Sequence, residues 1–113
     1  SSKKNKKSEN LIKLGCEIIF CKLNKNKKLN LKNIFNKIYS LKISDILVEA
    51  GGILFTELLN NNLVDEIHLF KSKIIIGKHG KPAIVGKKLN QLNVTLNERK
   101  KFKDDIYTNS EVN

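Results

Sequence analysis

The sequence predicts an α/β fold in which a mostly parallel sheet is flanked by helices and followed by an antiparallel hairpin. Three observations lead to this prediction. Short apolar runs typical of strands alternate with segments whose apolar residues recur at helical spacing. A glycine pair separates one of these runs from the helical segment that follows it. Near the C-terminus, two segments of alternating polarity flank residues 103–105, which predicts a hairpin over residues 92–112.

The first part of the chain is expected to hold a tail, the end of a helix and a strand. Residues 1–10 (SSKKNKKSEN) are polar and basic, and we expect a frayed tail there. Residues 9–14 resemble the last turns of a helix, and Gly15 suits the left-handed position that follows a helix. Residues 16–23 (CEIIFCKL) are rich in β-branched and aromatic side chains, which predicts a strand, and residues 24–28 (NKNKK) predict a solvated loop.

An amphipathic helix and a buried strand are predicted next. Asn30 is a favourable N-cap residue. The apolar residues after it fall on one helical face: Leu31, Ile34, Phe35, Ile38 and Leu41. Residues 45–49 (DILVE) are continuously apolar at their centre, which is typical of a strand buried on both faces. Gly51 and Gly52 end that run.

The remaining elements follow in the same alternation. Residues 53–60 (ILFTELLN) predict a helix that residues 61–62, both asparagine, terminate. Residues 66–70 (EIHLF) predict a strand, and residues 74–76, three isoleucines, predict further extended chain. Residues 77–82 (GKHGKP), with two glycines and a proline, predict a loop before the terminal hairpin.

The charge is strongly basic but unevenly placed. Lysine and arginine number 22 and acidic residues 11, which gives a net charge of +11 over 113 residues. Residues 1–30 alone carry nine lysines and two glutamates, or +7. Arg99 is the one arginine, so the chain has few side chains for bidentate contacts to bases. Aromatic residues make up 6% of the chain, so it also has few rings on which bases could stack. We therefore consider nucleic acid an unlikely partner and attribute the lysines to compositional bias.

Several further classes of protein are disfavoured. Asp45 and Glu49 interrupt the longest apolar run, so we expect no membrane-spanning helix, and residues 1–10 lack the apolar region of a secretory signal. Cys16 and Cys21 are five apart, which in a strand places them on opposite faces. We interpret them as free thiols in a reducing cytoplasm. No Cys/His set has ligand spacing, so no metal is expected.

The most informative segment for function is DILVEAGG, residues 45–52. In open α/β sheets, ligands bind beyond the C-terminal ends of the strands. Glu49 is therefore placed to accept hydrogen bonds from a polar substrate. Gly51 and Gly52 would allow an anionic group to approach the N–H groups that open the next helix. The alternative interpretation is a tight turn beside a solvated glutamate.

Other candidate residues are given structural interpretations. His68 should face opposite to Ile67 and Leu69, and we interpret it as a structural or exposed histidine. His79 lies in a glycine-flanked loop that we expect at the surface, and the alternative is contact with a substrate or cofactor phosphate. Residues 99–103 (RKKFK) are interpreted as a solvated strand face. No residue is assigned a catalytic role.

Several ordered motifs together resemble a known family. They are the runs at residues 47–51 (LVEAG), 63–66 (LVDE) and 73–77 (KIIIG). With the upstream Gly15 and the helix after Asn30, this order is similar to the second half of the reductase domain in the bifunctional riboflavin-biosynthesis deaminase–reductase family. The resemblance covers the chain from about residue 11, so residues 1–10 would be a basic tail and residues 11–113 a partial reductase domain.

The resemblance implies a dihydrofolate-reductase-like fold, truncated at its N-terminus, that acts as a homodimer. It implies NADPH-dependent reduction of 5-amino-6-(5-phosphoribosylamino)uracil to its ribitylamino form, and an upstream fused deaminase domain as a further partner. Glu49 matches the substrate-contacting glutamate of the family. The cofactor-binding turn and helix start would be Gly51, Gly52, Ile53, Leu54, Phe55, Thr56 and Glu57.

Two departures keep other hypotheses open. Lys71 and Ser72 stand where the family usually has Ala-Pro, and the first half of the family's domain and its deaminase zinc motif are absent from these residues. A basic nucleic-acid-binding protein and a non-catalytic dimerisation domain are the alternatives to the reductase. Steep salt dependence of nucleic-acid binding without nicotinamide affinity would favour the former.

Overall fold

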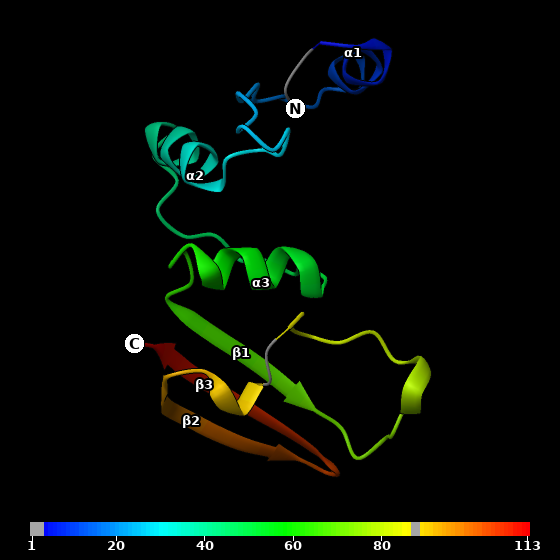
Figure 1. The fold of residues 1–113 in the computed structure, drawn as a ribbon, viewed down its shortest axis with the longest axis vertical. Coiled ribbons are helices and arrows are strands. Elements are labelled where there is room, and N and C mark those ends of the chain that lie inside the picture. The colour runs from blue at the N-terminus through cyan, green and yellow to red at the C-terminus, as the bar shows by residue number, and fades with distance from the viewer. Residues whose placement is uncertain (1–3, 87–88) are drawn as a thin grey trace. The chain divides into compact units, whose positions relative to one another are not determined.

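The computed structural model describes residues 4–86 and 89–113, which fall into two compact units, Ser1–Val48 and Glu49–Asn113 (Figure 1). The elements of the first unit are α1 (Lys6–Lys13) and α2 (Leu31–Ser40). Those of the second are α3 (Gly52–Asn60), β1 (Glu66–Lys71), β2 (Val94–Phe102) and β3 (Asp105–Val112), with two short 3-10 helices, η1 (Gly77–His79) and η2 (Leu89–Gln91).

Helix α1 begins earlier than the sequence suggests because two side chains cap it. Asn5 Oδ1 accepts a hydrogen bond from the Ser8 backbone N–H at 2.9 Å, and Ser8 Oγ accepts one from the Asn5 N–H at 2.8 Å. This reciprocal pair is a capping box, which satisfies two N–H groups at the helix start. Residues 6–10 are therefore helical rather than frayed, and residues 1–3 of the expected tail lie outside the described residues.

The end of α1 confirms the role predicted for Gly15. Its φ of +85° lies in the left-handed region that glycine adopts readily. The Gly15 N–H donates to the Ile12 carbonyl at 2.9 Å, and the Cys16 N–H donates to the Leu11 carbonyl at 3.0 Å. These two bonds make a Schellman motif, so the helix stops where local chemistry requires it to stop.

The strand predicted for residues 16–23 is not formed. Leu23 makes one isolated antiparallel bridge with Leu29. Among the described residues, this segment forms no other strand pairing. The prediction is wrong because β propensity favours an extended chain but supplies no neighbouring strand. The segment is instead tied to α2, whose Lys37 Nζ donates a hydrogen bond to the Phe20 carbonyl.

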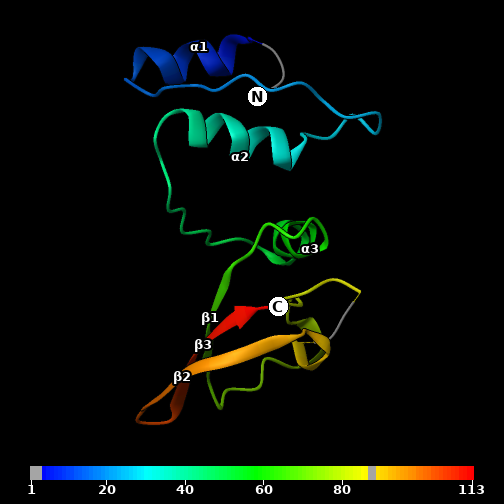
Figure 2. The same ribbon diagram turned by 90° about the vertical axis from the view of Figure 1, so that its left-hand side faces the viewer.

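Helix α2 follows its prediction closely (Figure 2). Asn30 Oδ1 accepts a hydrogen bond from the Asn33 N–H at 3.1 Å, which is the expected N-cap. The predicted apolar face is half-buried at Leu31, Ile34, Phe35 and Ile38. Leu41, the last residue of the predicted face, follows the helix and is 47% exposed.

Residues 45–49 also do not form the predicted strand. All five are exposed, and Leu47 is 80% exposed. A continuous apolar run is buried in a sheet only when strands lie beside it and helices cover it. The described chain pairs no strand with this run, so the prediction of a buried strand is wrong for these residues.

Helix α3 begins and ends as the sequence indicates. Gly51 is its N-cap and Gly52 its first residue, and it ends at Asn60, directly before the asparagines at 61 and 62. Asn62 has a φ of 52° and its N–H donates to the Leu59 carbonyl at 3.1 Å, while the Leu63 N–H donates to the Leu58 carbonyl at 3.0 Å. The same helix-stop motif that uses Gly15 in α1 uses an asparagine here.

The sheet in the second unit is antiparallel, with strand order β1-β3-β2 (Figure 1). A tight turn joins β2 to β3, which forces them to run in opposite directions. β1 pairs with the other edge of β3, also antiparallel. The expected mostly parallel sheet is not confirmed, because the two segments that would supply parallel strands, residues 16–23 and 45–49, pair with no strand in the described chain.

The predicted C-terminal hairpin is confirmed. Phe102 pairs with Asp105 at its end, and Lys103 adopts a φ of 53° in the turn between them. The register shifts between Leu96 and Glu98, which marks a bulge near the start of β2.

Burial is shallow throughout the described residues. The buried apolar side chains among them are Cys21 in the first unit and Leu58 and Ile84 in the second. The isoleucines at 74–76 are 77% to 91% exposed and belong to no strand, so the extended continuation expected there is not part of the sheet. No helix within the described ranges is long and apolar enough to cross a membrane.

Candidate functional site

The turn into α3 has the properties of an anion-binding helix start. Gly51 is the N-cap residue, with φ of −73° and ψ of 163°, and its carbonyl accepts the first helical hydrogen bond, from the Phe55 N–H at 3.1 Å. No side chain of the described residues caps the helix, and its first turn holds no acidic residue. The N–H groups of this turn therefore have neither a capping side chain nor a repelling carboxylate in the described chain, which favours a negatively charged group.

The two glycines of this turn have different structural roles. A Cβ atom added to Gly51 would meet nothing within 4 Å. A Cβ added to Gly52 would lie 2.3 Å from the Pro82 carbonyl oxygen and 3.2 Å from that of Ala83. The absence of a side chain at Gly52 is thus explained by the close approach of the chain's own backbone, whereas the space beside Gly51 is open.

Thr56, one turn further along α3, connects the helix to the same loop. Its Oγ1 donates a hydrogen bond to the Gly52 carbonyl at 2.6 Å and accepts one from the Val85 N–H at 2.8 Å. Ile84, the residue before Val85, is 5% exposed. Residues 82–85 are therefore held at the first turn of α3 by a side-chain hydrogen bond and a close backbone approach, and the isoleucine among them is buried.

The structure places the other predicted site residues around this turn. The Glu49 carboxylate is exposed three residues before the helix begins. Ile53 and Leu54 are 74% and 43% exposed, whereas Phe55, Thr56 and Glu57 are half-buried. The predicted substrate-binding and cofactor-binding residues are thus neighbours along one segment, and their roles in binding stay predictions.

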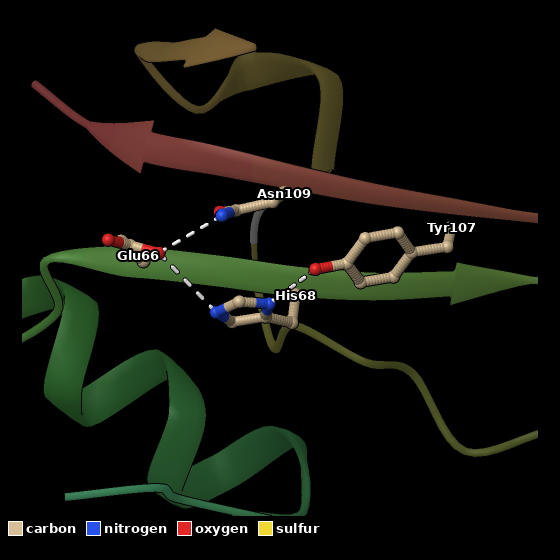
Figure 3. Close-up of polar contacts among 4 residues, drawn as sticks. All are labelled: Glu66, His68, Tyr107 and Asn109. Atoms are coloured by element: carbon tan, nitrogen blue, oxygen red, sulfur yellow. Dashed lines mark hydrogen bonds and ion pairs between the residues drawn. The ribbon is translucent and has the colours of Figure 1, made fainter. Parts of the chain in front are cut away.

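A second polar cluster lies on one face of β1 and β3 (Figure 3). His68 Nδ1 is 2.8 Å from Tyr107 Oη, and His68 Nε2 is 3.5 Å from Glu66 Oε2. Asn109 Nδ2 donates to Glu66 Oε2 at 3.1 Å, while Asn109 Oδ1 is buried and has no hydrogen-bond partner among the described residues. The Tyr107 ring also contacts the Phe70 ring, with centroids 4.9 Å apart.

Sequence reasoning anticipated only the β1 side of this cluster. Alternation places His68 opposite to Ile67 and Leu69, and the structure confirms this, because both apolar residues are half-buried and His68 is exposed. Tyr107 and Asn109 were not singled out, because their contact with His68 depends on the register between β1 and β3. Once the register between β1 and β3 is known, the alternate spacing of residues 107 and 109 places both side chains on the face that carries His68.

An ion pair lies on β2. Lys100 Nζ is 2.6 Å from Glu98 Oε1. This hydrogen bond, followed by the attraction of the carboxylate charge, raises the pKa of Lys100 above its usual value. Lys100 pairs with Tyr107 and Glu98 with Asn109, so the ion pair flanks the polar cluster.

Potential metal-ligating side chains are not gathered together in the described part of the chain. No group of three or more His, Cys, Asp or Glu side chains is arranged there to hold a metal ion. Cys16 is exposed, Cys21 is buried, and both are free thiols. The histidine interpreted as a surface residue, His79, is exposed in η1.

Comparison with curated proteins shows clear relatives. The chain is 29% identical over 87 residues to the riboflavin biosynthesis protein RibD of Actinobacillus pleuropneumoniae, which covers 76% of this chain and 23% of that protein. It is 33% identical over 57 residues to a 5-amino-6-(5-phosphoribosylamino)uracil reductase of Buchnera aphidicola subsp. Acyrthosiphon pisum, covering 50% of this chain and 28% of that one. The chain thus spans about a quarter of these relatives.

Solved structures share the fold. RibD of Acinetobacter baumannii superposes with a TM-score of 0.74 at 21% identity, covering 93% of this chain and 29% of that one. A pyrimidine reductase-like protein of Corynebacterium diphtheriae gives 0.75 at 22% identity, covering 93% and 42%. The family described as the RibD C-terminal domain matches residues 1–108. Since this match extends over nearly all of the 113 residues, the chain belongs to the RibD C-terminal domain family.

Proposed function

We propose that this chain takes part in the NADPH-dependent reduction of 5-amino-6-(5-phosphoribosylamino)uracil to its ribitylamino form, a step of riboflavin biosynthesis. The observation that carries the proposal is the family match over residues 1–108. A relative named as the reductase for this substrate supports the choice of reaction.

The start of α3 suits the phosphate groups of the cofactor. Its first-turn N–H groups lack a capping side chain, its first turn lacks an acidic residue, and the space beside Gly51 is open. In the proposal, these N–H groups hold a cofactor phosphate, while the side chains of residues 53–57 border it. When bound, the nicotinamide supplies the hydride, and the protein supplies position and charge.

Glu49 is proposed to orient the pyrimidine. Its carboxylate is exposed, and Glu49 lies two residues before Gly51, where the cofactor turn begins. A carboxylate at this position can accept hydrogen bonds from the amino and ring N–H groups of an aminopyrimidine. Glu49 would thereby place the ribosylamino carbon of the substrate against the nicotinamide, which is a positional contribution to the rate.

Binding measurements test the two halves of this proposal separately. NADPH and the ribosylamino-pyrimidine phosphate are each titrated calorimetrically into the chain, its Glu49→Gln variant and a Glu111→Gln control on β3. We expect Glu49→Gln to weaken pyrimidine binding by about tenfold, because one charge-assisted hydrogen bond is lost, and to leave NADPH binding unchanged. NADPH consumption by the chain with the pyrimidine is then followed by absorbance.

Three results would contradict the proposal. Absence of binding for both ligands would remove the reductase interpretation. Equal loss of pyrimidine binding in Glu49→Gln and Glu111→Gln would show that net charge, not the position of Glu49, is responsible. Tight, salt-dependent binding of an oligonucleotide without NADPH affinity would instead support the nucleic-acid alternative, which the charge of +11 permits.

The assembly and location of the protein are also proposals. We infer a homodimer, because β1 and β2 form the two outer strands of a three-stranded sheet and such edges favour pairing with another chain. Sedimentation at several concentrations tests this, and a monomer at all of them would contradict it. The two free cysteines support a reducing, cytoplasmic location. A fused deaminase domain stays a prediction from the resemblance.

A further inference from the structure

The hydroxyl group of Thr56 makes two hydrogen bonds that join parts of the chain far apart in sequence. Oγ1 donates to the Gly52 carbonyl at 2.6 Å, within the first turn of α3. It also accepts from the Val85 N–H at 2.8 Å, in the loop that precedes β2. We call this pair of bonds the Thr56 bridge. Its donor is in use and one of its lone pairs is occupied, so the hydroxyl is already engaged within the chain.

The loop reached by the bridge is held tightly against the same helical turn. The Pro82 carbonyl approaches so closely that a Cβ on Gly52 would lie 2.3 Å from it. Ile84 is 5% exposed, although its neighbours Ala83 and Val85 are exposed. Residues 82–85 therefore combine a close backbone approach to Gly52, a buried side chain and a hydrogen bond to Thr56.

The bridge affects the turn that precedes it in the helix. The Gly52 carbonyl, which accepts from Thr56, belongs to the peptide group that follows the Gly51–Gly52 turn. Gly52 lacks a side chain to restrict its rotation, so hydrogen bonds and close contacts fix the direction of its peptide groups. The helical bond from the Phe55 N–H to the Gly51 carbonyl is one of these, and the Thr56 bridge and the close approach of the Pro82 carbonyl add contacts from the loop.

We propose that Thr56 is a positioning residue, which holds residues 82–85 against the first turn of α3 and thereby fixes the Gly51–Gly52 turn for an anionic group of the cofactor. The proposal rests on the proposed function, because it takes that turn as the phosphate-binding part of a nicotinamide nucleotide site. Thr56 borders the site but acts through the backbone in this assignment, because its hydroxyl makes its two hydrogen bonds within the chain.

Two substitutions at Thr56 distinguish the effect of its hydroxyl group from the effect of its side-chain volume. Thr56→Val keeps the volume and removes the hydroxyl, whereas Thr56→Ser keeps the hydroxyl. Thr95→Val is the matched control, since the Thr95 hydroxyl bonds to Asn113 on the sheet and not to the loop. Native-state hydrogen exchange of the Val85 amide, followed by NMR, reports the bridge directly and needs no cofactor.

We expect Val85 exchange to become about tenfold faster in Thr56→Val, because its N–H loses its partner, and to stay near the wild-type rate in Thr56→Ser and Thr95→Val. The Kd for NADPH, measured by calorimetric titration of the same four proteins, should rise about tenfold in Thr56→Val and less than threefold in Thr56→Ser. Inorganic phosphate, as the smallest anionic probe, should show the same order.

The two readouts fail in different ways. Unchanged Val85 exchange in Thr56→Val would overturn the bridge itself. Faster exchange with unchanged NADPH affinity would overturn the positioning role while leaving the bridge in place. If the wild-type chain binds neither NADPH nor phosphate, the proposed function fails and the positioning role fails with it, whereas the exchange result still decides whether the bridge exists.

Discussion

His68 and Tyr107 are linked diagonally across the β1–β3 pair. His68 Nδ1 lies 2.8 Å from Tyr107 Oη, and the two rings stack with centroids 6.0 Å apart. In the register, however, His68 is opposite Asn109 and Tyr107 is opposite Phe70. Diagonal neighbours on one face of a sheet are within reach of aromatic side chains. The contact between His68 and Tyr107 therefore depends on the register in which β1 and β3 pair.

Removing the Tyr107 hydroxyl should weaken the sheet. Tyr107→Phe keeps the ring contact with Phe70 but removes the bond to His68. We expect the free energy of unfolding, measured by urea titration, to fall by about 1 kcal/mol. Tyr39→Phe is the control, because Tyr39 is 74% exposed, and its change should be within about 0.5 kcal/mol. Equal changes in both variants would show that the His68 contact contributes nothing.

Asn109→Asp should destabilise the protein at neutral pH. The Asn109 amide donates to Glu66 Oε2 at 3.1 Å, and the substitution replaces this donor with a second carboxylate. The expected loss is about 1 to 3 kcal/mol at neutral pH. It should shrink in acid, where the introduced carboxyl takes up a proton and can donate again. Thermal unfolding of the wild type and of Asn109→Asp, from neutral to acidic pH, measures how the difference in stability changes.

Asn97→Asp on β2 is the control for the added charge, because Asn97 is exposed on the same sheet. A loss for Asn109→Asp no larger than that for Asn97→Asp would show that general surface charge, rather than the pairing with Glu66, is responsible.

The two glycines before α3 should respond differently to alanine. Gly52→Ala places a Cβ against the Pro82 carbonyl oxygen, which cannot move without its backbone. We expect it to lower the free energy of unfolding by about 1 to 3 kcal/mol. Gly51→Ala meets open space, and its φ of −73° is compatible with alanine, so its change should be within about 1 kcal/mol. Chemical denaturation of both variants makes the comparison, and the reverse order would contradict the close approach at Gly52.

The Glu98–Lys100 pair predicts a measurable lysine titration. The hydrogen bond to Glu98 raises the pKa of Lys100, so Glu98→Gln should lower it toward the usual value of 10.5. A raised lysine pKa stabilises the folded state below the unfolded pKa, and this stabilisation disappears as the pH rises through the folded pKa. NMR titration of the Lys100 side chain measures the shift, and Glu111→Gln serves as the control.

Because the side chains of Lys100 and Glu98 are 56% and 43% exposed, added salt should reduce the difference in Lys100 pKa between wild type and Glu98→Gln. A Lys100 pKa that is the same in both proteins at low salt would contradict the contact.

Local chemistry determined the features that the sequence predicted correctly. Asn30 begins α2, Gly15 ends α1, and residues 61–62 end α3, because each cap depends on backbone groups within a few residues. The C-terminal hairpin is also local, since its strands are adjacent in sequence. The motifs of residues 47–51, 63–66 and 73–77 indicated the family, and residues 1–108 match it.

Only the tertiary structure decided which extended segments pair and which residues meet. Residues 16–23 and 45–49 have the composition of strands, but a strand needs a neighbouring backbone that composition does not specify. The contact of Tyr107 with His68 depends on strand register, and that of Thr56 with Val85 on a loop that returns across 29 residues of sequence. The sequence by itself therefore determined caps, turns and family, whereas long-range hydrogen bonding determined the sheet and the surroundings of the candidate site.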